Sequence, residues 1–577
     1  MKKNLLFLFL LQTAQFSFAE NREKSSIYLT PTDSASIAKG KNLFTQNCTS
    51  CHQIKVDGIG PRLSGITTII SPDWVKKIIQ NSQDVIASGD ERASQLFIKY
   101  KKAIMPSFSH LEEPEIDAIV DYLKTTKPIK NRFKKDYGAG IINPISAPIE
   151  VSNLVIDVKQ FTQFTASNDR FPFTRITKLA FQPTTGQLFI NDLRGKLYKM
   201  EGNMPVVYMD FAQLMPNFVH QPGLASGLGS FAFHPDFANN GLLYTNHTEK
   251  AGAAKADFGY SDSIKVMIQY VLTEWKIDDP SAEVFSGKGR ELLRINMPAV
   301  IHGMQELVFN PYAKKGDADY GLLYIGIGDG GSAENGFPFL TNKEEKVWGK
   351  ILRIDPQGNN SANKKYGIPA NNPLAKSSNK KAAKEIYASG FRNPHRITWT
   401  SAGDMLAVNV GHANIESLYK VESGHFYGWP IREGKFVIHD DGDMNQVYPL
   451  PANDRIFNVT YPVAAYDHDE GNAICGGFEY TGTAIPALKG KFLFGDIPSG
   501  RLFYINVADI KQGKIATIKE WKIALNDKPE TLKSMCGNDR VDLHFGIDSK
   551  GEMYILTKAD GKVYQIIGAK MPYKITE

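Results

Sequence analysis

Five consecutive residues, Cys48-Thr49-Ser50-Cys51-His52, have side chains whose types and spacing fit one covalent chemistry. Their C-x-x-C-H pattern is the attachment signature of a c-type haem. The two thiols add to the vinyl groups of the haem, and the histidine after the second thiol is an axial ligand of the iron. The chain is therefore expected to carry haem c and to handle electrons.

Helical periodicity on both sides of this motif predicts a small all-α domain at residues 33–127. Apolar residues recur at helical spacing in residues 34–44, in residues 72–79 and from about 112 to 124. Pro72 supports the second of these helices, because proline is favoured in the first turn. Three short helices around a prosthetic group form a domain whose core is largely the haem.

Beyond the motif, the segment 60–65 begins with Gly-Pro, and Met105 precedes a proline in a non-helical loop, where its thioether belongs to no packing stripe. In this order the segment resembles the class I cytochrome c domains. The resemblance implies that His52 and Met105 are the axial ligands, a pairing that raises the reduction potential. The alternative is that Met105 packs in the core and that His110, or no protein group, is the ligand.

The length and net charge of the chain are those of an ordinary protein with more than one domain. A length of 577 residues predicts at least two domains with sizeable cores. The net charge of +6, from 67 basic and 61 acidic residues, is too weak a bias to indicate nucleic-acid binding. No apolar run approaches the roughly 20 residues needed to cross a bilayer, so we expect no membrane span.

The N-terminus is typical of a secretory signal peptide, which we place at residues 1–19. Two lysines precede an apolar run at residues 5–11, and the small residues Ser17 and Ala19 flank a large one, as at a cleavage site. A membrane anchor is the alternative, but the apolar run is short for one. Export agrees with the haem motif, because c-type haem is attached outside the cytoplasm. We therefore expect a periplasmic protein.

Two further cysteines, Cys475 and Cys536, are not needed for haem attachment. In an oxidising compartment such a pair is expected to form a disulfide. The alternative is that both are buried free thiols.

From residue 151 to about 570 the sequence changes to short β-branched and aromatic runs separated by turn residues, which is typical of an all-β fold. A loose unit of two apolar strands recurs six times and predicts six four-stranded blades, with an array of β-sandwiches as the competing architecture. Residues 128–150, rich in lysine, glycine and proline, are predicted to be a linker. The repeated units begin at Leu179, Phe231, Leu307, Ile397, Gly477 and His544.

Several stretches of the β region resemble the glucose/sorbosone dehydrogenases, in the order in which that family has them. They are GLGSFAFHPDF (227–237), GIGDGG (326–331), GKILRIDP (349–356), GFRNP (390–394) and YGWP (427–430). The resemblance implies a six-bladed β-propeller that follows the cytochrome c domain. It also implies pyrroloquinoline quinone and calcium as cofactors, held at the mouth of the central channel.

The resemblance also assigns roles to individual residues. Oxidising a hydroxyl group by hydride transfer requires a base, a hydride acceptor and positive charge where the acceptor gains electrons. His302 matches the family's base, Asp329 the carboxylate that orients it, and Arg392 the cation beside the quinone oxygens. Further matches are Asn393 and Arg540 for quinone binding, and the backbone carbonyls of Gly411 and His412 for calcium.

Three positions depart from the family's cofactor site. Ala225 and Pro498 stand where the family has glutamine and lysine, and Asp542 stands where it has a second arginine. Pyrroloquinoline quinone is a tricarboxylate, so its site needs cations and hydrogen-bond donors. A carboxylate at residue 542 is expected to repel it.

The sequence therefore predicts a periplasmic quinoprotein dehydrogenase that oxidises a sugar or related alcohol. Its electrons are expected to pass one at a time to the attached haem and then to a downstream redox acceptor. The fusion of the two domains supports this interpretation, because a tethered haem is an acceptor at high effective concentration. The alternative is a propeller without quinone that binds a carbohydrate or protein partner, with the cytochrome as electron carrier or redox sensor.

Overall fold

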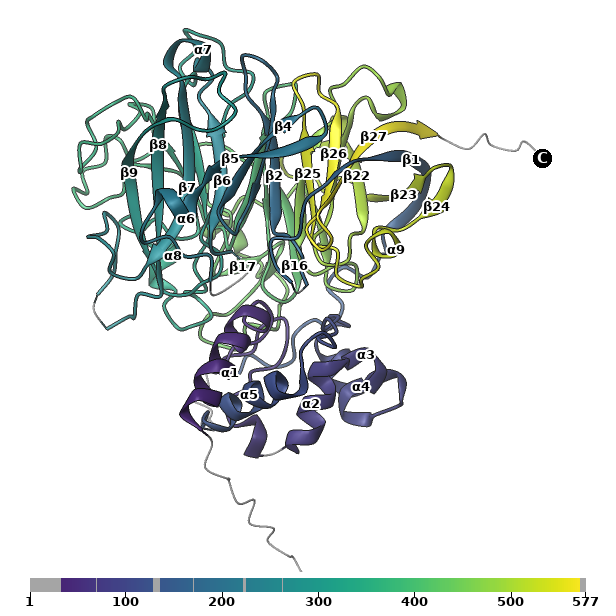
Figure 1. The fold of residues 1–577 in the computed structure, drawn as a ribbon. Coiled ribbons are helices and arrows are strands. Elements are labelled where there is room, and N and C mark those ends of the chain that lie inside the picture. Colours follow the sequence, from purple (N-terminus) through teal and green to yellow (C-terminus); the bar gives the residue numbers. More distant parts are fainter. Residues whose placement is uncertain are drawn as a thin grey trace, which may run out of the picture.

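The structure is a computed structural model that describes residues 33–68, 70–127, 135–169, 171–221, 225–261 and 263–570. The predicted signal peptide and the first part of the predicted linker, residues 128–134, lie outside these ranges. Within them, a small helical domain precedes a larger β domain and lies against one end of its strands (Figure 1).

The helical domain contains the three predicted helices and two that were not predicted. The additional helices, α3 and α4, are short and begin at side-chain caps: Asn81 accepts a hydrogen bond from the Gln83 backbone N–H, and Asp90 accepts one from that of Ala93. Such caps satisfy backbone donors that the first turn of a helix leaves free. The helices are α1 (Ser34–Asn47), α2 (Pro72–Gln80), α3 (Ser82–Ala87), α4 (Glu91–Lys99) and α5 (Glu113–Lys124), with a 3-10 turn at Ile66–Thr68.

The core of this domain forms where α1 crosses α5. Phe44 of α1 and Ile119 of α5 are buried there, and the ring of Phe44 lies 5.4 Å from that of Tyr122. The crossing is close because residue 40 is glycine. A Cβ atom on Gly40 would lie 1.7 Å from the carbonyl oxygen of Ala118. The two helices therefore fix the start of the haem motif, which follows the end of α1.

Within the described residues, the β domain contains three separate four-stranded sheets. They consist of β6 (Leu228–Phe233), β7 (Leu242–Lys250), β8 (Ile268–Ile277) and β9 (Gly287–Met297); of β10 (Met304–Phe309), β11 (Leu323–Ile327), β12 (Lys350–Ile354) and β13 (Ile386–Ser389); and of β14 (Pro394–Trp399), β15 (Met405–Asn409), β16 (Ile415–Lys420) and β19 (Ala464–Asp467). Neighbouring sheets pack through apolar faces. Leu272 and Leu293 of the first, for example, share a buried cluster with Leu307 of the second.

A further 13 strands form one continuous sheet, and a short hairpin of β17 (Arg432–Glu433) and β18 (Phe436–Val437) stands apart. The number of six blades thus stays a prediction. The strands of the large sheet are β20 (Ile474–Glu479), β21 (Lys491–Asp496), β22 (Leu502–Asn506), β23 (Lys519–Leu525), β24 (Lys528–Glu530), β1 (Glu150–Gln163), β27 (Lys562–Lys570), β26 (Met553–Thr557), β25 (Leu543–Ile547), β2 (Ile176–Phe181), β3 (Leu188–Asp192), β4 (Lys196–Glu201) and β5 (Met204–Asp210).

The first strand of the β domain lies between two of its last strands. Ile156 of β1 is opposite Ile523 in the parallel partner β23 and opposite Ala569 in the antiparallel partner β27. The two ends of the domain are therefore joined by backbone hydrogen bonds.

The described part of the predicted linker is bound to the β domain. Tyr137 stacks on the ring of His439 at 3.5 Å, and its hydroxyl group donates to Asp441 at 2.8 Å. The Ile141 backbone N–H donates to the Val447 carbonyl at 2.8 Å. Residues 135–149 thus belong structurally to the β domain, although their composition resembles that of a solvated connector.

Cys475 and Cys536 are free thiols, so the predicted disulfide is absent from the structure. Cys475, in β20, donates its S–H to the Leu543 carbonyl at 3.1 Å. Cys536 ends the short helix α9 (Leu532–Cys536). Both belong to one apolar cluster, and burial raises the pKa of Cys536 to about 12. In the part of the chain that the structure describes, no helix is long and apolar enough to cross a bilayer.

Candidate functional site

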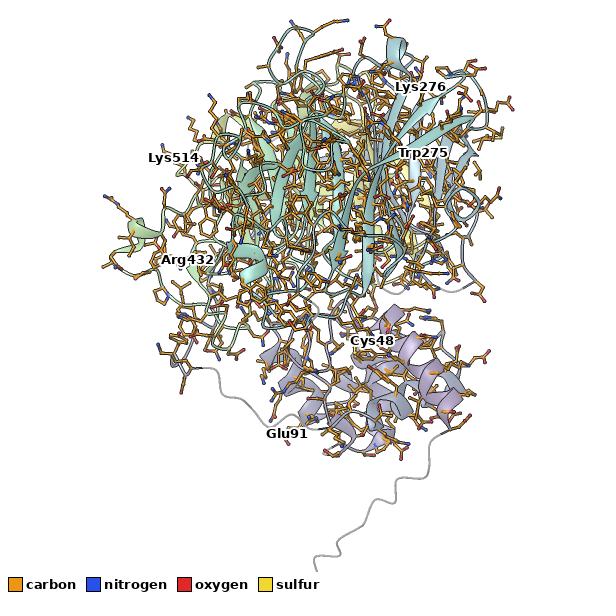
Figure 2. The ribbon with its side chains drawn as sticks, turned by 90° about the vertical axis from the view of Figure 1, so that its left-hand side faces the viewer. Cys48, Glu91, Trp275, Lys276, Arg432 and Lys514 are labelled. Carbon is orange, nitrogen blue, oxygen red and sulfur yellow. The ribbon has the colours of Figure 1, made fainter. Side chains whose placement is uncertain are left out.

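An interdomain cavity lies where the helical domain meets the end of the β domain. The helical domain contributes Cys51 and Ile104, and Figure 2 places Cys48 at the boundary and Glu91 at the far side of the helices. The cavity brings together many of the residues that the sequence singled out. From the β domain its lining includes Ala225, His302, Arg392, Asn393, Pro498, Arg540 and Asp542.

The haem motif occupies the turn that ends α1. The Cys48 N–H donates to the Phe44 carbonyl, and the His52 N–H donates to the Cys48 carbonyl, each at 2.8 Å. The His52 ring nitrogen Nδ1 lies 2.9 Å from the Pro61 carbonyl, so Nδ1 carries the proton and Nε2 keeps its lone pair. Burial lowers the pKa of His52, which favours the neutral form that binds iron.

The surroundings of His52 fit a haem. Residue 60 must be glycine, because a Cβ atom there would lie 2.4 Å from the His52 ring. The Met105 carbonyl accepts a hydrogen bond from the Ser82 hydroxyl at 2.9 Å, which holds the methionine loop against the helices. Partly buried apolar side chains, including those of Leu63, Ile70 and Met105 itself, pack against the core of the helical domain. Axial ligation by His52 and Met105 stays a prediction.

Met105→Ala is expected to abolish the charge-transfer band from sulfur to ferric iron and to lower the reduction potential, because a Met/His pair raises that potential. Absorption spectra of the oxidised protein and a potentiometric titration measure the two effects. Met204→Ala, at an exposed residue of β5, is the control. A band that persists in Met105→Ala would contradict the assignment.

His302 and Asp329 form a hydrogen-bonded pair at the cavity. His302 Nδ1 lies 3.1 Å from Asp329 Oδ1. Asp329 is fully buried, and its other partners are the Gly331 N–H at 2.8 Å and the Trp429 indole N–H at 3.0 Å. The carboxylate thus fixes the ring and leaves Nε2 as the nitrogen available to a bound molecule. Burial, and then Arg392, lower the pKa of His302 against the opposing effect of Asp329.

Arg392 is held by Glu334, which was not predicted from the sequence. Its Nε donates to Glu334 Oε1 at 3.0 Å, and its Nη2 donates to the same oxygen. Glu334 also accepts a hydrogen bond from Gln53 of the helical domain and lies 3.1 Å from His412 Nδ1. Burial would raise the pKa of Glu334, but Arg392 and His412 outweigh it and hold the pKa well below its usual value. A single carboxylate therefore connects the residue next to His52 with the arginine of the cavity.

The backbone groups of the residues predicted for calcium have partners within the chain, and calcium binding stays a prediction. The Gly411 carbonyl accepts a hydrogen bond from Arg392 Nη1 at 2.5 Å. The His412 N–H donates to Glu433 at 2.7 Å. Within the described ranges, no three His, Cys, Asp or Glu side chains are grouped to hold a metal ion.

Asp542, which departs from the family's cofactor site, has two cationic partners in the structure. Arg540 Nε donates to Asp542 Oδ1 at 2.8 Å, and Lys558 Nζ lies 3.9 Å from Asp542 Oδ2. Burial would raise the pKa of Asp542, but Arg540 and then Lys558 lower it. Two cations thus neutralise the carboxylate that was expected to repel an anionic cofactor. Arg540 also interacts with the Cys51 side chain across the domain boundary.

Further lining residues escaped the sequence analysis. His395 and Arg396 of β14, His544 of β25 and Lys558 all face the cavity. The sequence contains one signal that could have identified them, because basic side chains stand inside strand patterns that are otherwise apolar.

Comparisons with known proteins agree with the division of the chain into a helical domain and a β domain. A family model described as Glucose / Sorbosone dehydrogenase matches residues 173–564, and one described as Cytochrome c matches residues 37–127. The HIPL1 protein of Arabidopsis thaliana is 24% identical over 384 residues, which cover 59% of this chain and 53% of that protein. Quinoprotein glucose dehydrogenase B of Acinetobacter calcoaceticus is 25% identical over 342 residues, which cover 55% and 64%.

The chain spans about half the length of the curated relatives that it matches. Among solved structures, the apo-form of the soluble aldose sugar dehydrogenase of Escherichia coli matches with a TM-score of 0.51 and 17% identity. The match covers 72% of this chain and 99% of that one. At this identity the likeness concerns the fold of the β domain.

Proposed function

This chain belongs to the glucose/sorbosone dehydrogenase family and carries a cytochrome c domain, and from that premise we propose that it is a periplasmic quinoprotein dehydrogenase. It oxidises a sugar or related alcohol and passes the electrons to its own haem, from which a downstream acceptor takes them. We further propose that its β domain is a six-bladed propeller. The observation that carries the proposal is one cavity lined by His302, Arg392 and the haem-binding Cys51.

The lining of the cavity suits pyrroloquinoline quinone, which when bound supplies a two-electron acceptor for hydride. Among the described residues, four cationic side chains line the cavity, and each also forms an ion pair with a carboxylate of the protein. Three carboxylate groups need such donors. The cationic residues are Arg392, Arg396, Arg540 and Lys558.

His302 is the base of the proposed reaction. Its Nδ1–H is held by Asp329, so Nε2 takes the proton of the substrate hydroxyl. The neutral ring is the reactive form, and its lowered pKa keeps it neutral at pH 7. Arg392 supplies positive charge beside the acceptor, and Glu334 fixes the plane of the guanidinium group.

In this proposal the electron outlet is at the same cavity, because Cys51 is one of its lining residues. A haem attached through Cys51 would supply a one-electron acceptor at a cavity whose lining also includes His302 and Arg392. The electrons would therefore leave without diffusion of a separate carrier.

The pH profile of the reaction tests the role of His302. We expect kcat/KM to fall with acid through a pKa below the usual 6.5, because burial and Arg392 disfavour the protonated ring. Asp329 favours the protonated ring, because its carboxylate raises the pKa of His302. Asp329→Asn is therefore expected to move the acid limb of the profile to still lower pH and also to reduce the rate. Steady-state rates of haem reduction between pH 4 and 9 measure both effects. An acid limb that moves to higher pH in Asp329→Asn would refute the assignment.

Reconstitution tests the function as a whole. The purified protein with haem attached is incubated with pyrroloquinoline quinone, and haem reduction is followed after addition of a panel of aldoses and sugar alcohols. Reduction that needs both quinone and sugar is expected. The absence of quinone binding, together with no haem reduction by any sugar, would defeat the proposal.

A second candidate function is favoured by one observation. Arg392 already makes hydrogen bonds to Glu334 and to the Gly411 carbonyl, as it would in a site that holds no quinone. The β domain would then bind a carbohydrate or protein partner, with the haem as electron carrier or redox sensor. Sugar binding without quinone binding in the same titration would support this alternative.

A further inference from the structure

The interdomain cavity contains two histidines and a lysine that the proposed proton and hydride transfer does not use. His395 lies in β14, His544 lies in β25, and Lys558 directly follows β26. All three line the cavity, with exposed fractions of 8%, 2% and 7%. The ring centroids of the two histidines are 5.6 Å apart. Three strands from two parts of the β domain thus bring these side chains to one wall.

These histidines carry polar atoms without partners. Among the residues that the structure describes, none forms a hydrogen bond with Nδ1 of His395 or with either ring nitrogen of His544. The same holds for Oδ1 of the neighbouring Asn393. A buried polar atom left unpaired is destabilising, because it has lost its hydrogen bonds to water. Such atoms at the wall of a cavity therefore indicate a molecule that pairs with them.

Lys558 brings positive charge to the same wall, and its Nζ lies 3.9 Å from the carboxylate of Asp542. Burial lowers the pKa of Lys558 to about 8, although Asp542 raises it, and nearby arginines add to the lowering. Burial, together with Arg396 and Lys558, lowers the pKa of His395 and of His544 well below the usual value. The rings are therefore neutral, and each offers one N–H donor. The group that fits carries negative charge for Lys558 and oxygen acceptors for the two rings, as a carboxylate does.

We propose that His395, His544 and Lys558 form a carboxylate-binding subsite in the interdomain cavity. The identity of the ligand rests on the proposed function. The carboxylate belongs either to the quinone, which has three, or to a sugar acid that is oxidised in place of a neutral sugar. In the first case Lys558 supplies the cation that Pro498 cannot, and the histidines supply the donors that are missing at Ala225.

The test is a binding titration of the full-length protein with haem attached and no quinone. Lys558→Met removes the charge and keeps the length of the side chain, and His544→Gln changes the ring. Lys550→Met, at an exposed residue in the turn before β26, is the matched control. Pyrroloquinoline quinone and its trimethyl ester are titrated separately, and equilibrium dialysis gives each Kd.

The Kd of the quinone is expected to rise about tenfold or more in Lys558→Met and His544→Gln, the loss typical of one charge-assisted hydrogen bond. It is expected to stay unchanged in Lys550→Met. The ester, which has no charge to lose, is expected to bind these two variants as it binds the wild type. The haem spectrum and thermal midpoint of each variant show that it is folded.

Galacturonate and galactose, titrated in parallel, identify the source of the carboxylate. If Lys558→Met weakens galacturonate binding and leaves quinone binding unchanged, the subsite takes the carboxylate of the substrate. If the wild type binds no quinone but binds galacturonate through Lys558, the proposed function fails and the subsite stands. Equal Kd values in wild type and folded variants for both carboxylate ligands would overturn the subsite, as would the absence of binding of either ligand to the wild type.

Discussion

His302→Ala is expected to reduce sugar-dependent haem reduction by about 10²- to 10⁴-fold, the range that a positioned general base contributes. Its Nε2 is the nitrogen that faces a bound molecule, because Asp329 holds Nδ1 at 3.1 Å. The haem itself should be unaffected, since His302 lies in the β domain and makes no bond to the helical domain within the described residues. The loss is therefore expected in turnover, with the haem spectrum and quinone binding retained.

Stopped-flow reduction of the haem by sugar, compared with reduction by a chemical donor such as ascorbate, measures this effect. The chemical donor should reduce wild type and His302→Ala equally. His425→Ala is the control, because that side chain is 41% exposed and does not line the cavity. Turnover within threefold of the wild type in His302→Ala would remove this residue from the mechanism.

Glu334→Ala is expected to lower the free energy of unfolding of the β domain by about 3–5 kcal/mol, because it leaves the buried charge of Arg392 without its partner. Replacing a buried pair by apolar residues is often tolerated, but removing one partner is not. Urea unfolding followed by intrinsic fluorescence measures the loss, and haem absorbance reports separately on the helical domain.

Two variants separate this effect from others. Glu344→Ala, at an exposed residue in the following loop, controls for loss of a surface charge and should change stability by less than about 0.5 kcal/mol. Gln53→Ala removes only the donor from the helical domain and leaves the pair with Arg392 intact. It is expected to leave β-domain stability nearly unchanged. A Glu334→Ala protein as stable as Glu344→Ala would show that the Arg392 charge does not depend on Glu334.

The parts of the site that the sequence predicts are those built from adjacent residues. The C-x-x-C-H motif is contiguous, and His302, Asp329 and Arg392 each lie in a short stretch that resembles one family. The structure brings His302 and Arg392 to the lining of one cavity and pairs Asp329 with His302. Local patterns carry this information because each stretch is a single strand end or turn.

The parts that could not be predicted depend on contacts between distant segments. Nothing in the sequence near Gln53 indicates that it meets Glu334, 281 residues away in the chain. His395 and His544 lie in apolar strands, where a histidine is an ordinary satisfied core residue unless its neighbours are known. The expected disulfide was wrong for a similar reason. Cys475 and Cys536 share a cluster, but strand β20 directs the Cys475 thiol to a backbone carbonyl.

The position of Cys51 also constrains how the protein is assembled. In the folded protein Cys51 lines the interdomain cavity and interacts with Arg540 of the β domain. A maturation enzyme that joins haem to the thiol needs open access to Cys51 and to the buried Cys48. We therefore expect haem insertion to come before the two domains dock.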